Sequence, residues 1–453
     1  MNIIMTKNKK VIVSIILYAL FSITFFILHV IGLSGRSVWE SWAQLAVISG
    51  MAFSFGFASY YILTSGEIQK KLYSIGAITL VFFILLFFFM PHPGYILNDL
   101  NIYSFHAKIF TQYHQNPYIV KPLEFATDND YHFVEMWKNQ NYNYGPLWLA
   151  ISSLPSLVTK NISIVLGLYK YMALLFYIGI AYFLYLLRDR DAKKMFLFAI
   201  NPIVLYWGVM GAHNDLAMIF FAICSLYFLK KEKAYRAFIF LGLAILIKYI
   251  AVLLAPILFA HIYKRYKFQN LLYLVVVFFA TIIVAYAPFH IGFNSILGNA
   301  TLILPKLGGP LFTGVYASVH KGLEMNDTIF LQIKNIFFVL FALGYGIIII
   351  KNWKRVSEYK NISNIFVSVL IWFYLCAYWF QAWYLIWIIP FLWMRDPLKH
   401  AIFASALIWY GLSFYFLSYV YSSAFGLVVA LLLFLPIFFI FQHLRKVVFL
   451  EEN

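Results

Sequence analysis

The 453-residue chain has few charged side chains, since only 11% of its residues are Asp, Glu, Lys or Arg, whereas 63% are hydrophobic. A soluble domain of this length could not hide so much apolar surface, so the bilayer must solvate most of the chain. Peptide groups in lipid must be paired internally, which leaves helices or a closed barrel. The apolar runs 77–90 and 427–441 lack the alternation of a barrel strand. The sequence therefore predicts an all-α polytopic membrane protein.

Cysteine is also scarce. Cys224 and Cys376 lie in apolar segments and read as small buried residues, which excludes a disulfide framework and a cysteine metal site. The chain has no other metal-ligand spacing, no glycine-rich nucleotide loop and no nucleophile elbow. No soluble domain that could bind a nucleotide sugar is evident. We therefore expect no cofactor, and a metal ion is not expected.

Acidic residues number 17 against 34 basic ones, for a net charge of +17. If the N-terminus is cytoplasmic and the spans alternate, most of the basic residues fall in inside loops, as the positive-inside rule requires. The basic residues then determine the topology and contact anionic lipid headgroups, and nucleic acid is not an expected partner. This arrangement places both termini in the cytoplasm.

The apolar runs predict about 12–14 transmembrane helices. They lie near 11–32, 43–64, 73–91, 164–187, 195–210, 216–230, 236–247, 249–263, 270–290, 329–350, 362–379, 383–394, 398–419 and 423–442. The pairs around Lys248 and around Gln381–Trp383 are each either one long helix or one broken helix. The segment Pro146–Val158 is too short to span, so we expect a half-helix against the outer surface.

Three regions follow from this pattern. Residues 1–72 form two N-terminal transmembrane helices, and residues 73–290 form a core that includes an outer loop at 92–163. Residues 291–453 form a C-terminal membrane region with a second outer loop at 291–328. Both loops are rich in Tyr, Asn, His, Gly and Pro, and we expect them to carry juxtamembrane helices.

Asp99 opens the first outer loop, where the chain leaves the hydrocarbon. A carboxylate there is partly desolvated, which predicts a raised pKa and a base poised near neutral pH. The alternative is that Asp99 is only the N-cap of the helical stretch that follows.

Polar residues also gather at Gly211–Asp215, between two apolar spans, and at Lys248. Such groups near lipid usually face a cavity or one another. For Gly211–Asp215 the alternative is a polar turn capped by Asp215, and for Lys248 it is a lysine that snorkels to the interface. The stretch Tyr378–Tyr384 has the aromatic content of an interfacial belt, although aromatic faces also suit sugar rings.

The order of these residues resembles the integral-membrane glycosyltransferases of the GT-C superfamily, most closely the polyprenol-phosphate mannosyltransferase-like branch. The matching motifs, over roughly residues 73–395, are Asp99, Tyr103, Pro117–Tyr118, Tyr144–Gly145–Pro146–Leu147, Asn201–Pro202, His213–Asn214–Asp215–Leu216, Lys248–Tyr249, and Trp383–Tyr384 with Pro390. Asn98 stands where the family usually has a second acidic residue. The chain also has extra spans before residue 73.

The resemblance implies a GT-C fold and an inverting hexosyltransferase. It would move a mannose-like sugar from a polyprenyl-phosphate donor to an envelope glycan, glycolipid or teichoic-acid-type acceptor on the outer membrane face. Asp99 would be the catalytic base, with Lys248 and His213 binding the donor phosphate. The expected substrate-binding residues are Asn98, Tyr103, Tyr118, Tyr144, Asn214, Asp215, Tyr249, Gln381, Trp383 and Tyr384. His320 and Lys321, in the second outer loop, match no motif and are weaker candidates for phosphate or acceptor contacts.

Two other functions are compatible with intramembrane polar residues. One is a transporter or flippase of lipid-linked sugars, which should show internal repeats and polar residues near mid-membrane. We find no repeat in the sequence. The other is a non-catalytic subunit of envelope polysaccharide synthesis, in which the polar residues would be expendable.

Overall fold

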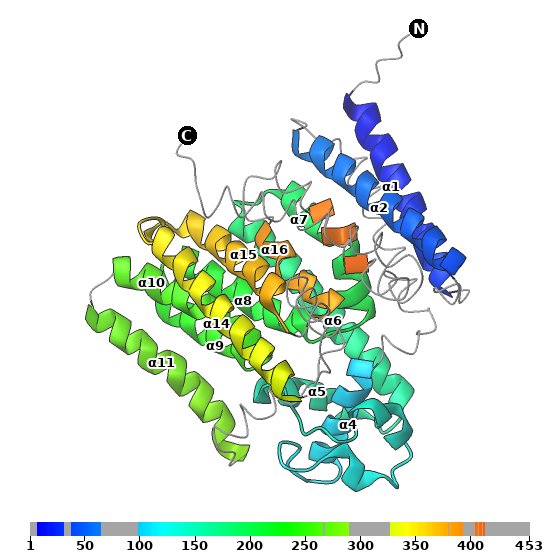
Figure 1. Cartoon of the computed structure of the whole chain (residues 1–453), viewed down its shortest axis with the longest axis vertical. Helices are drawn as coiled ribbons and strands as arrows, with labels where there is room; N and C mark the ends of the chain where they lie inside the picture. Colours follow the sequence, from blue (N-terminus) through cyan, green and yellow to red (C-terminus); the bar gives the residue numbers. More distant parts are fainter. Residues whose placement is uncertain are drawn as a thin grey trace. The chain divides into compact units, whose positions relative to one another are not determined.

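The computed structural model describes residues 7–30, 38–64, 98–265, 268–289, 327–378 and 380–392, with short pieces at 404–405, 407–409 and 411–412. All secondary structure in these ranges is helical (Figure 1), which confirms the predicted all-α fold. The predicted spans 73–91 and 423–442, most of 398–419, and nearly all of the loop 291–328 lie outside the described residues, as do His320 and Lys321.

Within the described ranges, five helices are long and apolar enough to cross a membrane, and a sixth span is possible if one bent helix pair counts as a single crossing. The five are Ala43–Thr64, Ile162–Leu187, Leu271–Phe289, Leu331–Lys351 and Tyr359–Cys376. Large apolar side chains remain exposed along two of them, as expected for lipid-facing surfaces, among them Val276, Ile283, Val284, Phe338 and Leu343. The protein is therefore a multi-pass membrane protein, and the total of about 12–14 spans stays a prediction.

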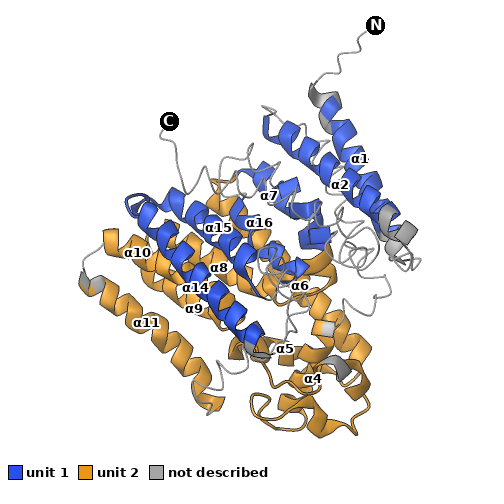
Figure 2. Ribbon diagram, viewed as in Figure 1, with its two compact units in different colours: residues 1–86, 191–205, 305–453 blue, residues 87–190, 206–304 orange. Residues whose placement is uncertain are grey.

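The chain divides into two compact units that alternate along the sequence (Figure 2). Unit 1 comprises residues 1–86, 191–205 and 305–453, and unit 2 comprises 87–190 and 206–304. The three-region division expected from the sequence stays a prediction.

In unit 1, α1 (Lys7–Val30) and α2 (Val38–Thr64) lie side by side (Figure 1). The Tyr18 hydroxyl of α1 donates a hydrogen bond to the carbonyl of Ile200, and Trp409 Nε1 donates one to Ser49 Oγ of α2 at 2.9 Å. Both helices are thus bonded to other parts of their unit.

The remaining elements of unit 1 include a pair of packed helices, α14 and α15. The bounds are α7 (Ala192–Ala199), α14 (Asp327–Lys351), η6 (Arg355–Ser357), α15 (Tyr359–Cys376), η7 (Ala382–Trp387) and α16 (Ile389–Leu392). Cys376, at the end of α15, is a buried free thiol, and so is Cys224 in unit 2. Both are the buried, unbridged residues expected from the sequence.

The predicted single span 195–210 is wrong. Helix α7 ends at Ala199, and a π-helix, η3 (Val204–Met210), begins after Asn201–Pro202. Asn201 Oδ1 accepts hydrogen bonds from the amides of Ile203 and Val204 at 3.1 and 3.4 Å. Because Pro202 has no amide hydrogen and Asn201 caps the next turn, the pair ends one helix and starts another.

Unit 2 includes the loop segment 98–161 and a set of packed helices, in which α8 contacts both α6 and α9, and α9 also contacts α11. Its bounds are α4 (Asn98–Thr111), η1 (Pro122–Phe125), η2 (Tyr131–Trp137), α5 (Pro146–Val158), α6 (Ile162–Leu187), α8 (Asp215–Lys230), α9 (Ala234–Ile245), η4 (Tyr249–Leu254), α10 (Ala255–Arg265), α11 (Phe268–Tyr286) and η5 (Ala287–Phe289). Helix α5 has the bounds predicted for the half-helix. It begins with a proline, as helices often do.

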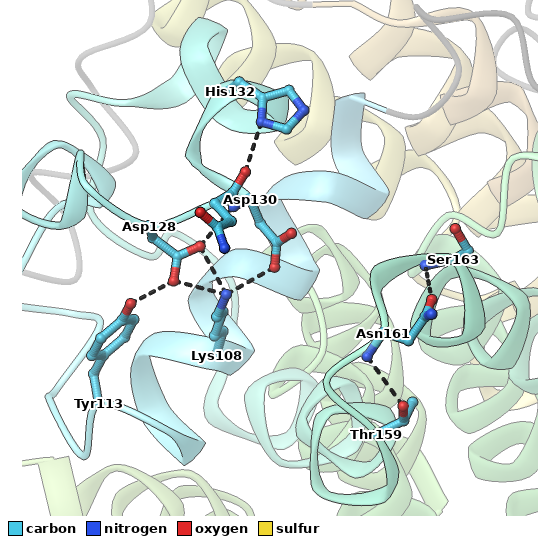
Figure 3. Close-up of polar contacts among 9 residues, drawn as sticks. Lys108, Tyr113, Asp128, Asp130, His132, Thr159, Asn161 and Ser163 are labelled. Atoms are coloured by element: carbon cyan, nitrogen blue, oxygen red, sulfur yellow. Dashed lines mark hydrogen bonds and ion pairs between the residues drawn. The ribbon is translucent and has the colours of Figure 1, made fainter.

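Charged and capping contacts order the segment between α4 and α6 (Figure 3). Lys108 Nζ, on α4, lies 2.7 Å from Asp128 and 2.8 Å from Asp130, and the Tyr113 hydroxyl donates to Asp128. Asn161 Oδ1 accepts from the amide of Ser163 at 3.0 Å and so caps α6. The contacts of Lys108 tie the loop between η1 and η2 to α4, the helix that carries Asp99.

Candidate active site

Asp99 lies in the first turn of α4 and is mostly buried, with 13% of its side chain exposed. Its Oδ2 atom is 3.3 Å from Nδ1 of His213 and accepts a hydrogen bond from the Tyr103 hydroxyl at 3.4 Å. Tyr103 is one helical turn along α4, so it faces the same side as Asp99. Since these partners are side chains, the N-cap alternative does not account for Asp99.

His213 is presented by a strained turn. Ala212 has a φ of 45°, an uncommon left-handed conformation for a residue with a side chain. A Cβ on Gly211 would lie 2.7 Å from the carbonyl oxygen of Trp207, so the turn needs glycine at that point. The turn bends the chain by 108° between η3 and α8, and it brings His213 and Asp215 into unit 2 next to Asp99 and Lys248.

Lys248 stands at a break in a helix. Helix α9 ends at Ile245, and Lys248 is extended (φ −149°, ψ 125°) before η4 begins. Its Nζ atom lies 2.8 Å from Oδ1 of Asp215, whose side chain is completely buried. The broken-helix alternative is therefore correct here. An ion pair with a buried carboxylate is also unlike a lysine that snorkels to water.

Burial of the Asp99 carboxyl acts to raise its pKa, but the hydrogen bond and electrostatic attraction of His213, together with the charge of Lys248, outweigh burial and hold the pKa below its usual range. The raised pKa predicted from the sequence is thus wrong, because that prediction counted burial of the carboxyl without the contacts of His213 and Lys248. Asp99 is ionised at neutral pH.

The tyrosines predicted to bind substrate form a connected group. The Tyr103 ring packs edge-on against Tyr144, with ring centroids 5.1 Å apart. The carbonyl oxygen of Tyr144 accepts hydrogen bonds from the hydroxyls of Tyr118 at 2.9 Å and Tyr249 at 3.3 Å. Their hydroxyls therefore fix the backbone ahead of α5, and their contact with substrate stays a prediction.

Of the two asparagines predicted to bind substrate, Asn98 and Asn214, the structure describes the side chain of Asn214 alone. Asn98 begins α4, and its side chain lies outside what the structure describes. Asn214 is only 1% exposed, and neither atom of its amide group has a hydrogen-bond partner among the described residues. A buried amide in that state is costly unless a ligand or water bonds to it, so Asn214 is suited to a sugar hydroxyl.

Gln381, Trp383 and Tyr384 belong to unit 1. Gln381 is buried and extended, and it precedes η7, so this helix is also broken. The Tyr384 ring stacks on Trp387 with centroids 4.3 Å apart, and its carbonyl accepts a hydrogen bond from Tyr374. The structure places five of the predicted site residues together in unit 2: Asp99, Tyr103, His213, Asp215 and Lys248. Gln381, Trp383 and Tyr384 form part of unit 1 instead.

Sequence reasoning missed Lys170. It lies in the candidate span α6 and is only 3% exposed. The signal was available, because a lysine within a long apolar run is a functional candidate by default. No group of three or more His, Cys, Asp or Glu side chains that could hold a metal ion occurs in the searched ranges.

Comparison with known proteins matches residues 42–264 to the MptA/B family, described as "Alpha-(1->6)-mannopyranosyltransferase, N-terminal domain". No curated protein matches the chain. The matched stretch includes Asp99, the turn at 211–215 and Lys248, whereas Gln381 and Trp383 lie beyond it. The likeness to the GT-C superfamily read from the sequence is thereby confirmed. Through residues 42–264, the chain belongs to the alpha-(1->6)-mannopyranosyltransferase family of GT-C-type membrane glycosyltransferases.

Proposed function

We propose that the protein transfers mannose from a polyprenyl-phosphate donor to a hydroxyl of an envelope glycan, glycolipid or teichoic-acid-type acceptor, in an α-1,6 linkage and on the outer face of the membrane. The observation that carries the proposal is the pairing of two carboxylates with two cationic or hydrogen-bonding side chains: Asp99 with His213, and Asp215 with Lys248. One pair suits proton removal and the other suits an anionic leaving group.

In the proposed reaction, Asp99 accepts the proton of the acceptor hydroxyl as its oxygen attacks the anomeric carbon. The bond between that carbon and the phosphate oxygen breaks on the opposite side, and polyprenyl phosphate leaves with the electron pair. The sugar carbon is inverted. Both contacts of Asp99 are made by Oδ2, so Oδ1 is the oxygen we assign to the proton.

Lys248 would neutralise the departing phosphate, with His213 as a second donor. Asp215 is held in place by complete burial, and its contact with Nζ fixes where the ammonium lies. Binding of a donor phosphate would divert the charge of Lys248 from Asp99. The pKa of Asp99 should then rise in the complex, which makes the carboxylate a better base when substrate is present.

A transfer assay with purified protein in detergent tests the donor. We expect mannose transfer from polyprenyl-phosphate mannose and none from a nucleotide-linked mannose. Because detergent leaves no compartment, product formation would also exclude transport as the activity. Transfer from the nucleotide sugar alone would overturn the proposed donor.

A further inference from the structure

The helix is interrupted before Lys248, and backbone amides at the start of α5 form hydrogen bonds with the carbonyls at this interruption. The last carbonyls of an α-helix lack partners within the helix. At the end of α9, the carbonyl oxygen of Leu246 accepts hydrogen bonds from the amides of Leu147 at 3.1 Å and Trp148 at 3.3 Å. The carbonyl oxygen of Ile247 accepts from the amide of Gly145 at 3.3 Å. The amides that begin α5 thus donate to the carbonyls that end α9, although the Trp148 amide is shared with the carbonyl of Gly145 at 3.0 Å.

Gly145 makes this joint possible. A Cβ at Gly145 would lie 2.1 Å from the carbonyl oxygen of Leu246 and 2.8 Å from its Cα. These are backbone atoms, so no side-chain rotation can make room. Its φ of −73° is ordinary, and glycine is therefore needed for the close approach of two backbones and not for an unusual conformation.

Two tyrosine hydroxyls also stabilise the contact between α5 and the end of α9. Tyr118 and Tyr249 both donate to the carbonyl of Tyr144, immediately before Gly145. Tyr249 directly follows Lys248, and its own hydroxyl accepts from Tyr286 at 2.9 Å. The residues on either side of Lys248 are thereby bonded to the segment that starts α5.

The joint also has an electrostatic consequence. A helix C-terminus carries partial negative charge and a helix N-terminus partial positive charge. Bare carbonyls at the end of α9 would repel an anion beside Lys248. Their bonds to the N-terminus of α5 cancel much of this repulsion.

We propose that Gly145 is a positioning residue, which lets α5 dock on the end of α9 so that Lys248 meets Asp215 and can bind the donor phosphate. This inference rests on the proposed function, because Lys248 binds phosphate only if the donor is a lipid phosphate sugar. In this proposal, the Tyr144–Leu147 motif does not touch the donor. Its amides bind the carbonyls of Leu246 and Ile247 and so fix the position of Lys248, which binds the donor phosphate.

The test compares Gly145→Ala with Gly167→Ala, a control in α6 where an added Cβ meets nothing within 4 Å. A shift of Lys248 by a fraction of an ångström should raise KM for polyprenyl-phosphate mannose by about ten- to a hundredfold. We expect kcat to fall as well, because Lys248 also neutralises the departing phosphate, and we expect Gly167→Ala to resemble wild type.

A double substitution distinguishes an effect of Gly145 on the position of Lys248 from a general loss of structure. If Gly145 acts through Lys248, adding Lys248→Gln to Gly145→Ala should raise donor KM little further, whereas the full effect should appear in the Gly167→Ala background. Should Gly145→Ala fail to fold, Tyr118→Phe removes one bond to Tyr144 and should still raise donor KM, with Tyr113→Phe as its control.

The outcomes are distinct. If Lys248→Gln alone leaves donor KM unchanged, the proposed phosphate role fails, and the positioning role with it. If Lys248→Gln raises donor KM but folded Gly145→Ala, or Tyr118→Phe in its place, does not, only the positioning inference is overturned. Additive effects of Gly145→Ala and Lys248→Gln would also overturn it.

Discussion

At the scale of single residues, the chemistry of the site depends on the balance between burial and charge at Asp99. Burial alone would favour the protonated acid. His213 and Lys248 reverse that tendency and keep the carboxylate ionised. A base that is ionised before substrate arrives needs no separate deprotonation step, and its basicity can rise when a donor phosphate takes up the charge of Lys248.

This balance predicts two different acid limbs in the pH dependence of transfer. The kcat/KM profile reports the free enzyme, in which Asp99 has a lowered pKa, so its acid limb should lie below the usual range of an aspartate. The kcat profile reports the complex, so its acid limb should lie at higher pH. Initial rates across pH, at limiting and saturating donor, measure both. Acid limbs that coincide near pH 6–7 in both profiles would show that His213 and Lys248 do not control the pKa of Asp99.

The buried pair between Lys248 and Asp215 predicts a stability effect. Lys248→Met leaves the completely buried Asp215 without its cation, which should cost about 3–5 kcal/mol. Adding Asp215→Leu removes the isolated charge and should recover most of the loss. Thermal unfolding in detergent, followed by circular dichroism, compares the two variants. A double variant less stable than Lys248→Met would contradict the account.

At the scale of elements, the site is assembled where helices are interrupted. A strained turn precedes α8, and α9 breaks before Lys248. Breaks of this kind are tolerated in a membrane protein only where other groups satisfy the freed peptide bonds, as α5 does for α9. In unit 1, Gln381 lies at a break of the same kind.

Much of this arrangement could be predicted. The bounds of α5 followed from an apolar run that begins with proline, and breaks near Lys248 and Gln381 were suspected from polar residues between apolar runs. The docking of Gly145 on Leu246 could not be predicted, because it joins backbones about a hundred residues apart, and no side-chain pattern marks it. The helix break at Asn201–Pro202 has a recognisable sequence signal, because an asparagine followed by a proline disfavours a continuous helix.

Helix α4 carries a second pH-sensitive group. His106 is buried against Tyr142, and burial lowers its pKa to about 4. The unfolded loop therefore binds a proton that the folded loop excludes. Stability from His106 is present above about pH 6.5 and is lost as the pH falls towards 4.

We expect the melting temperature of wild type to fall between pH 7.5 and pH 5 by more than that of His106→Leu. The exposed His132 provides the control, since His132→Gln should keep the wild-type pH dependence. Equal falls in wild type and His106→Leu would contradict this assignment.

At the scale of the whole molecule, the two ends of the unit 2 helices differ in chemistry. Helix α8 begins at Asp215, in the site, and ends at Lys230, which bonds to the carbonyl of Leu187 at the end of α6. Arg188 and Lys231 lie at that same end. The positive-inside rule assigns the basic end to the cytoplasm, which would place the site on the outer face.

Labelling of single cysteines tests this orientation. Asn129→Cys, at an exposed position between η1 and η2, should react in intact cells with a thiol reagent that cannot cross membranes. Lys354→Cys, between α14 and α15, should react only after permeabilisation. The native cysteines are buried and should give little background. The reverse pattern would place the site on the cytoplasmic side.

The central claim is that Asp99 removes the acceptor proton during transfer of mannose from a polyprenyl-phosphate donor. Turnover of Asp99→Asn, measured with that donor in detergent, tests it most directly. We predict a loss of about 10²- to 10⁴-fold in kcat at normal expression, with donor KM little changed. Wild-type turnover by a well-folded Asp99→Asn protein would contradict the account.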